Sequence, residues 1–187
     1  MLTGTLVDLR KMRDSDLESF YDLYHGDVSR RGPFWPSGPS AFASLSDIKK
    51  RYQEDGFWKP LEKFSILLIV DKAGKLLGFV GFHPSMYDAY EIAWIIFDPQ
   101  SRGKGYASEA TRMLIDYLFD GMKLNRLEAY IHPDNAASRH LAEKCGLKYE
   151  ATLRQIWYQH GKYQDLTLYA IVREDASAGQ SSQAART

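Results

Sequence analysis

The sequence predicts a mixed α/β (α+β) fold, because strand patterns alternate with helical patterns along most of the chain. Residues 63–82 and 149–172 each contain two β-rich runs joined by a short polar turn, which predicts two hairpins. Residues 89–131 contain a strand, a helix and a second strand. A helical crossover of this kind predicts that the strands at 89–97 and 126–131 pair in parallel.

Chain length and net charge limit the number of domains and the kinds of binding partner that are expected. The chain has 187 residues, of which 44% are hydrophobic, enough for one large domain with a sizeable core. We expect a single domain over residues 1–173 and a disordered polar tail over residues 174–187. Lys and Arg number 24, as do Asp and Glu, so the formal net charge is zero. This balance argues against direct binding of nucleic acid or an anionic membrane.

The cysteine, histidine and apolar patterns indicate the cellular compartment and whether a metal site is expected. Cys145 is the one cysteine, so no intramolecular disulfide can form, and a small buried side chain is its expected role. Since no segment has the pattern of a signal peptide or a membrane span, we expect a cytoplasmic protein. The five histidines are scattered without cysteine or carboxylate at ligand spacing, so we expect no metal site.

The first third of the chain predicts one strand and two helices around a long irregular connection. Residues 6–9 form a short strand pattern, and residues 14–16 supply caps for a helix that buries an aromatic face. A second helix is predicted to begin after Ser44 and to end at Gly56. Residues 26–44, between the helices, combine Gly, Pro and Ser with aromatic and basic side chains. Long connections of this kind often carry function.

The central feature of the sequence is a strand that runs through a glycine-rich turn into a helix, over residues 95–110. A helix start presents unpaired N–H groups and partial positive charge, which suits a phosphate or pyrophosphate. Gly103 and Gly105 let an anion approach the backbone, and Arg102 and Lys104 add positive charge. In the preceding strand, alternation predicts that Glu91, Ala93, Ile95 and Phe97 share one face.

The second half of the chain predicts a strand at 126–131, a helix after Asn135 that Gly146 ends, and a closing hairpin. The helix that follows the glycine turn is predicted to stop near Gly121. In the helix after Asn135, helical spacing predicts that the inward residues are Ala137, Leu141 and Cys145.

Two motifs in this order resemble the GNAT acyl-CoA-dependent N-acyltransferases. Gln100-Ser101-Arg102-Gly103-Lys104-Gly105 is similar to the family's Arg/Gln-x-x-Gly-x-Gly/Ala signature. Asn135-Ala136-Ala137-Ser138, followed by Glu143-Lys144-Cys145-Gly146-Leu147, resembles the signature of the RimJ/RimL-type branch, the ribosomal-protein N-terminal acetyltransferases. The closing hairpin, with Gly161-Lys162-Tyr163-Gln164-Asp165 and Tyr169, looks like that branch too. The resemblance covers residues 3–173.

The resemblance implies a GNAT fold, with a mixed central sheet of about six to seven strands and about four helices. The sheet would splay open between the strands at 89–97 and 126–131, and acetyl-CoA, the acyl-donor co-substrate, would lie in that gap. Its pantetheine would pair with the strand main chain, and its pyrophosphate would bind the turn. The implied contacts are Ile95, Ile96, Phe97, Arg102, Gly103, Lys104, Gly105, Tyr106, Ala107, Asn135 and Ser138.

The implied chemistry is direct acetyl transfer to a primary amine within a ternary complex. An α-amine has a pKa of about 7.7–8.0 and a lysine-type amine about 10.4, so the latter needs a base. Glu91 is the candidate base because it interrupts an apolar strand, although an ion pair at a strand end explains it equally well. Many relatives of the family have a tyrosine seven residues after the motif asparagine, where it protonates the leaving thiolate. This chain has Ala142 at that position. Ser138 or water would then protonate the thiolate.

The acceptor is the least defined part of the prediction. Candidate acceptor-binding residues are Arg31, Phe34 and Trp35 in the long connection and Asp165 in the hairpin, although all four also suit structural roles. The acceptor would be a protein N-terminus or a small molecule such as an amino sugar, an amino acid or an antibiotic. An acyl-CoA-binding module without turnover is an alternative that Ala142 motivates, and a nucleotide-phosphate binder is another. A homodimer is compatible with either enzyme or module.

Overall fold

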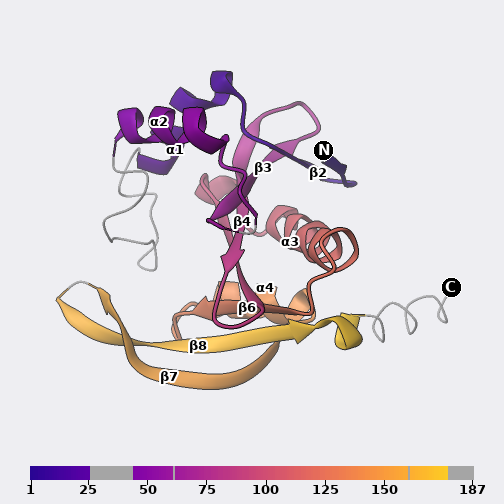
Figure 1. Ribbon diagram of the computed structural model, residues 1–187, viewed down its shortest axis with the longest axis vertical. Coiled ribbons are helices and arrows are strands. Elements are labelled where there is room, and N and C mark those ends of the chain that lie inside the picture. The colour runs from indigo at the N-terminus through magenta and orange to yellow at the C-terminus, as the bar shows by residue number, and fades with distance from the viewer. Residues whose placement is uncertain (26–43, 61, 160, 177–187) are drawn as a thin grey trace, which may run out of the picture. The chain divides into compact units, whose positions relative to one another are not determined.

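The computed structural model describes residues 1–25, 44–60, 62–159 and 161–176 (Figure 1). The strands form one sheet in the order β1-β2-β3-β4-β5-β6-β8-β7, which confirms the mixed α/β class. The sheet has eight strands rather than the six to seven predicted, because the residues before the first predicted strand add the two-residue strand β1 (Leu2–Thr3). By its internal contacts the chain divides into two compact units.

The first unit, which we call the N-terminal unit, comprises Met1–His83 and Ala93–Met113. Antiparallel pairing joins β1 to β2 (Val7–Arg10), β2 to β3 (Ser65–Asp71) and β3 to β4 (Leu76–Pro84). Its helices are α1 (Leu17–His25), α2 (Leu45–Asp55) and α3 (Tyr106–Asp116), with short 3-10 turns at Asp14–Asp16 and Pro99–Ser101. The two hairpin strands and both early helices were predicted within a few residues of these bounds.

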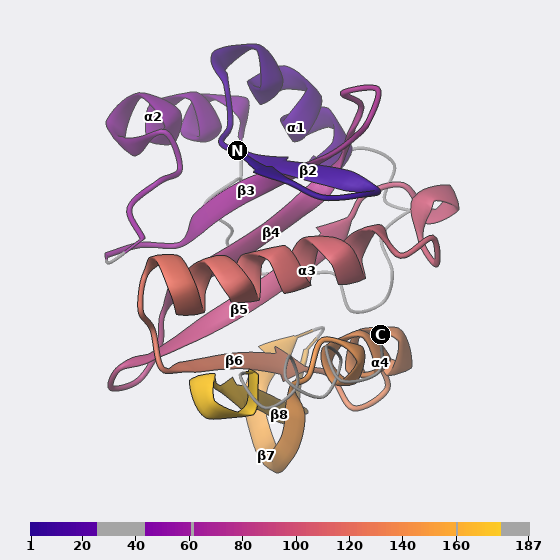
Figure 2. The same cartoon turned by 90° about the vertical axis from the view of Figure 1, so that its right-hand side faces the viewer.

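An aromatic core joins α1 and α2 to one face of the strands. The Phe20 ring lies 5.9 Å from that of Phe79 and 5.8 Å, edge to face, from that of Phe97. Ile95 packs against the same cluster, so the predicted sharing of one face by Ile95 and Phe97 is confirmed. In Figures 1 and 2, α3 lies on the opposite side of β3 and β4 from α1 and α2.

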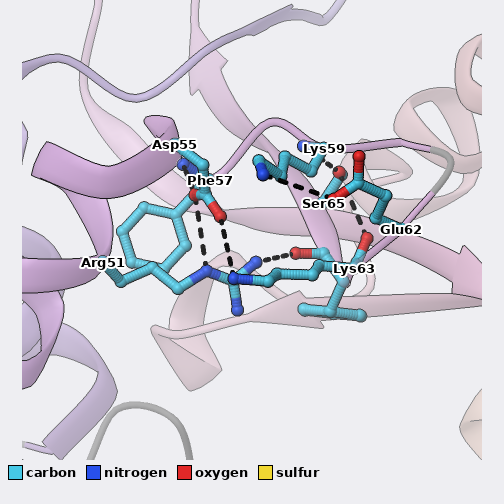
Figure 3. Close-up of polar contacts among 8 residues, drawn as sticks. Arg51, Asp55, Phe57, Lys59, Glu62, Lys63 and Ser65 are labelled. Carbon is cyan, nitrogen blue, oxygen red and sulfur yellow. Dashed lines mark hydrogen bonds and ion pairs between the residues drawn. The ribbon is translucent and has the colours of Figure 1, made fainter.

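A cluster of polar side chains lies between the end of α2 and the start of β3 (Figure 3). Gly56 caps α2 in the left-handed conformation at φ 59°, as predicted. The Asp55 carboxylate is buried, accepts from the Phe57 N–H at 2.9 Å and lies 3.5 Å from Arg51 Nε and 3.8 Å from Lys63 Nζ. Arg51 also donates to the Phe64 carbonyl. These contacts hold the turn between α2 and β3 in one conformation.

The second unit, the C-terminal unit, comprises Pro84–Ile92 and Leu114–Thr187. Its elements are β6 (Arg126–Ile131), α4 (Ala136–Lys144), β7 (Lys148–Gln159) and β8 (Lys162–Val172), and a π-helical turn (Tyr117–Gly121) follows α3. Within this unit, the first residues of β5 (Ala89–Ile96) pair in parallel with β6, from Ala89–Arg126 to Glu91–Glu128. The predicted parallel crossover is therefore confirmed.

The packing of α4 differs from the prediction. Ala137 is exposed, whereas Ala142 is completely buried and Cys145 is buried. Cys145 is buried as predicted and Leu141 is half-buried, so the prediction was wrong for Ala137 and missed Ala142. Since both residues are alanines, composition alone does not distinguish which of them faces the core. At the end of the described chain, residues 173–176 form one helical turn at the start of the predicted polar tail.

Candidate functional site

The glycine turn has the backbone conformation that the sequence predicts. Gly103 and Gly105 adopt φ values of +75° and +87°, which favour glycine. A Cβ on Gly103 would meet nothing within 4 Å, so the backbone is accessible there. A Cβ on Gly105 would lie 3.3 Å from the Leu6 Cδ1. The Asp98 carboxylate shapes the entry to this turn by accepting from the Gln100 N–H at 2.9 Å.

The helix start after this turn offers N–H groups to an anion. The helical ladder of α3 begins where the Glu109 N–H donates to the Gly105 carbonyl at 3.0 Å. Amide groups earlier in the turn have no acceptor inside the helix, and the helix dipole adds positive charge at this end. The turn therefore fits the pyrophosphate of CoA, with accessible backbone at Gly103.

Arg102 has a bracing role that the sequence pattern did not indicate. Its Nε donates to the Ile96 carbonyl at 3.2 Å and its Nη2 to the Phe97 carbonyl at 3.3 Å. The guanidinium thus ties the glycine turn to the end of β5 while its charge stays at the turn. Lys104 is exposed beside it.

The main chain at the end of β5 is oriented by β4. The Phe97 N–H donates to the Leu77 carbonyl at 2.9 Å. A Cβ on Gly78 would lie 1.9 Å from the Ile95 oxygen, so only glycine permits this approach of the two strands. Because successive peptide groups of a strand point to opposite edges, the Ile96 groups point away from β4. That edge is where the predicted pantetheine pairing would take place.

Glu91, the candidate base, has a carboxylate neighbour that the sequence analysis missed. Glu91 pairs in register with Glu128 of β6, and partners in a parallel pair project on the same face. Glu128 is 8% exposed and accepts from Arg126 Nε at 2.7 Å, the Tyr130 hydroxyl at 3.0 Å and Ser85 Oγ at 3.3 Å. Only the alternation of Arg126, Glu128 and Tyr130 along β6 signals this network in the sequence.

Hydrogen bonds and burial shift pKa values within this network. Arg126 forms a bidentate pair with Glu150, at 3.0 and 2.6 Å, and this bond lowers the pKa of the Glu150 carboxyl below its ordinary value. Burial first, and then the hydrogen bond to Glu128, raise the pKa of the Tyr130 hydroxyl, with a smaller contribution from Glu91. The network contains three acidic side chains, Glu91, Glu128 and Glu150, and one basic side chain, Arg126.

Asn135 and Ser138 lie together at the start of α4. The Asn135 Oδ1 accepts from the Ser138 N–H at 3.2 Å and caps the helix. Ala142, at the position where many relatives carry tyrosine, is completely buried, so the helix presents no hydroxyl there. His132 precedes this start, where its Nδ1 accepts from the Asp134 N–H at 3.1 Å and its Nε2 lies 2.9 Å from the Gln164 Oε1.

The predicted acceptor residues are only partly described. Asp165 accepts from the Gln155 N–H at 2.8 Å, where the pairing of β7 with β8 is irregular between Leu153 and Trp157. Gln155 has a φ of 52°, so this bond supports a strained backbone position. Asp165 therefore has the structural role in the hairpin that was one of its two predicted roles. Arg31, Phe34 and Trp35 lie outside the described residues.

The described ranges, residues 1–25, 44–60, 62–159 and 161–176, also bear on metal and membrane sites. Within those ranges, no group of three or more His, Cys, Asp or Glu side chains is placed to hold a metal ion. No helix in the part of the chain that the structure describes is long and apolar enough to cross a membrane.

Known proteins resemble this chain over most of its length. A sequence model described as an acetyltransferase (GNAT) domain matches residues 7–148. Bacillus subtilis YoaA, described as an uncharacterized N-acetyltransferase, is 36% identical over 172 residues, which cover 88% of this chain and 92% of YoaA. A spermidine N(1)-acetyltransferase of Vibrio cholerae is 32% identical over 168 residues, 89% of this chain and 93% of that protein. RimL, a ribosomal L7/L12 α-N-protein acetyltransferase solved with coenzyme A, shares the fold at a TM-score of 0.73 and 20% identity, covering 90% of this chain and 95% of RimL.

Proposed function

Since this chain belongs to the GNAT acetyltransferase family, we propose that it moves an acetyl group from acetyl-CoA to a primary amine within a ternary complex. The observation that carries the proposal is the glycine turn before α3, with accessible backbone at Gly103 and the first helical bond at Gly105. Such a turn binds a pyrophosphate. The family membership, rather than the turn alone, supports CoA as the ligand.

In this proposal the N-terminal unit supplies cofactor contacts at the end of β5 and in the glycine turn. The main-chain amides of residues 103–107 hold the pyrophosphate, because the Arg102 N–H already donates to the Pro99 carbonyl at 3.1 Å. The Ile96 N–H pairs with the pantetheine, because the Ile96 carbonyl already accepts from Arg102 Nε. Within the C-terminal unit, Asn135 and Ser138 are the residues that the family motif implies for cofactor binding. When bound, acetyl-CoA supplies an activated thioester, and the chain's own residues position the amine and move the protons.

We assign the proton chemistry to Glu91 and Ser138. Glu91 takes a proton from the amine nitrogen as that nitrogen bonds to the carbonyl carbon. A main-chain N–H near the end of β5 donates to the oxygen that becomes negative. Ser138, or a water molecule, donates a proton to the sulfur as the carbon–sulfur bond breaks. One proton leaves the amine and one proton reaches the sulfur, so the reaction is balanced and no other reactant is required.

Two classes of acceptor have support from the relatives. The 32% identity to a spermidine N(1)-acetyltransferase supports a polyamine, and the likeness of the Asn135–Ser138 motif to the RimJ/RimL-type branch supports a protein N-terminus. The excess of carboxylates around Glu91 and Glu128 suits a cationic amine, which both classes provide near neutral pH. Amino sugars, amino acids and amine-bearing antibiotics complete the acceptor set to be tested.

A thiol-release assay tests the proposal. Free thiol produced from acetyl-CoA would be measured with spermidine, spermine, N-terminal peptides, amino sugars and amino acids, above and below pH 8. We expect turnover above background with at least one of these amines. Thermal stabilisation by CoA without turnover on any amine would favour the acyl-CoA-binding module. Stabilisation by ATP or NAD but not by CoA would overturn the cofactor assignment.

A further inference from the structure

The carboxylate of Glu109, in the first turn of α3, binds three successive backbone N–H groups near the N-terminus. Its Oε1 accepts from Thr5 at 2.8 Å, and its Oε2 accepts from Leu6 at 2.7 Å and from Val7 at 2.8 Å. Thr5 and Leu6 lie in the turn between β1 and β2, and Val7 is the first residue of β2. The Gly4 N–H closes this turn by donating to the Val7 carbonyl at 3.0 Å. More than 100 residues separate the two sides of this contact.

The N-terminal turn is pressed closely against α3. A Cβ on Gly4 would lie 2.7 Å from the Val7 oxygen, 2.8 Å from the Met113 sulfur and 2.9 Å from the Glu109 carboxyl carbon. Glycine at position 4 therefore permits the close approach. On the other side, Lys72 donates to the Gly4 carbonyl and pairs with Asp8 at 2.7 Å. The turn is thus held in place by contacts from α3 and from the β3–β4 connection.

Leu6, in this turn, lies beside Gly105 of the glycine turn. Its Cδ1 lies 3.3 Å from the position of a Cβ on Gly105, although 43% of the residue is exposed. The Leu6 N–H is one of the groups that Glu109 binds, so the carboxylate fixes the backbone from which this side chain projects. Glu109 therefore links the placement of Leu6 to that of Gly105.

The charge of Glu109 also matters for an anion site. A carboxylate in the first turn of a helix would ordinarily compete with a bound anion for the positive end of the dipole. Here the three N–H groups of residues 5–7 take up that negative charge. The carboxylate can therefore stay beside the anion seat at a lower cost in repulsion.

We propose that Glu109 is a positioning residue of the CoA site, holding the N-terminal turn so that Leu6 packs on Gly105. The glycine turn then keeps the conformation that receives the pyrophosphate. This inference rests on the proposed function, because it assumes that CoA binds this turn. The alternative is that the contact between Glu109 and residues 5–7 stabilises the fold without affecting the affinity for CoA.

Calorimetric titration with CoA separates the two roles. We expect Glu109→Gln and Leu6→Ala each to raise the dissociation constant about tenfold, the effect of losing one well-placed contact. The matched controls are Asp16→Asn, which alters a carboxylate that accepts the Arg13 N–H at 2.7 Å, and Leu23→Ala, which truncates a leucine on α1 that is 37% exposed. Both controls should bind CoA with wild-type affinity.

Hydrogen exchange gives a second readout that a purely structural contact would not change. Since coupling between two sites is reciprocal, CoA should slow exchange of the Thr5, Leu6 and Val7 amides in the wild type. This protection should be smaller in Leu6→Ala, an exposed site whose change leaves the fold intact even if Glu109→Gln unfolds. Wild-type affinity in Leu6→Ala, with no CoA-dependent protection of residues 5–7, overturns the inference and leaves the proposed function standing. Failure of the wild type to bind CoA overturns both.

Discussion

The guanidinium of Arg102 donates to the carbonyl of Ile96 at 3.2 Å, which ties the glycine turn to the strand that precedes it. A second bond, to the Phe97 carbonyl at 3.3 Å, makes the contact two-pronged. Both halves of the proposed CoA seat, strand edge and turn, are therefore held in one arrangement by one side chain. The planar fork of arginine suits this geometry, whereas an ammonium cannot reproduce it.

Arg102→Lys keeps the charge but loses the fork, so we expect CoA affinity to fall by about tenfold. Calorimetric titration would measure the change. Lys104→Ala is the matched control, because it removes an exposed charge from the same turn and should have the smaller effect. A larger loss of affinity in Lys104→Ala than in Arg102→Lys would contradict the bracing role.

Gly105→Glu tests the placement of the pyrophosphate. Gly105 has a φ of +87° and a Cβ there would meet Leu6 at 3.3 Å, so the new side chain strains the turn and adds negative charge at the anion seat. We expect CoA affinity to fall by about a hundredfold or more. Gly74→Glu is the control, since Gly74 has a similar φ of +84° in the β3–β4 connection. It should lower the melting temperature without a matching loss of CoA affinity, and equal losses would refute the placement.

Glu91→Gln tests the base. The substitution keeps the size of the side chain and removes its basicity, so we expect the maximal rate to fall by about a hundredfold with little change in CoA affinity. The rate should be measured with saturating acetyl-CoA and amine across a range of pH. Glu18→Gln, on the exposed face of α1, should behave as wild type. A wild-type rate for Glu91→Gln at every pH would remove Glu91 from the mechanism.

Asp55→Ala tests the polar cluster of Figure 3. The Asp55 side chain is 1% exposed, so its removal leaves the Phe57 N–H without its acceptor and Arg51 without its carboxylate. We expect a loss of about 2–4 kcal/mol in the free energy of unfolding, measured with urea. Lys63→Met is the control, because the Lys63 side chain is 47% exposed and its pair with Asp55 spans 3.8 Å. An equally large loss of unfolding free energy in Lys63→Met would mean that the ion pair between Lys63 and Asp55 accounts for the stabilisation instead.

Much of the fold follows from local patterns along the chain. The caps at Ser44 and Gly56 set the ends of α2, and alternation along residues 89–97 places Ile95 and Phe97 on the core face. The motif at residues 100–105 predicted the family correctly, and the GNAT resemblance is confirmed. These signals succeed because each depends on a few neighbouring residues with a specific backbone or burial preference.

The missed residues depend on contacts between distant segments. Nothing near Glu109 in the sequence indicates that it binds the N–H groups of residues 5–7, because the partner is main chain and offers no residue pattern. The Arg102 brace also uses carbonyl groups as acceptors. In β6, the register with β5 that brings Glu91 beside Glu128 depends on the sheet pairing, which strand patterns alone leave undetermined.

Glu150→Gln tests the electrostatics of the Arg126 network through pH. The hydrogen bond from Arg126 lowers the pKa of the Glu150 carboxyl below its ordinary value of 4.5, and partial burial opposes this shift. A carboxyl whose pKa is lower in the folded state adds stability above its unfolded pKa, and that stability is lost as pH falls through the folded pKa. Because the Glu150 side chain is 40% exposed, we expect Glu150→Gln to cost about 0.5 kcal/mol in the free energy of unfolding at pH 7.

Below a pH of about 4 this difference from the wild type should shrink, since the wild-type carboxyl is then increasingly protonated. Urea unfolding at pH 7 and at several values between pH 5 and about 3 would measure the trend. Glu54→Gln, an exposed position on α2, serves as the control and should show no such trend. A difference between wild type and Glu150→Gln that stays constant as the pH falls would mean that the contact with Arg126 stabilises the fold by packing rather than by charge.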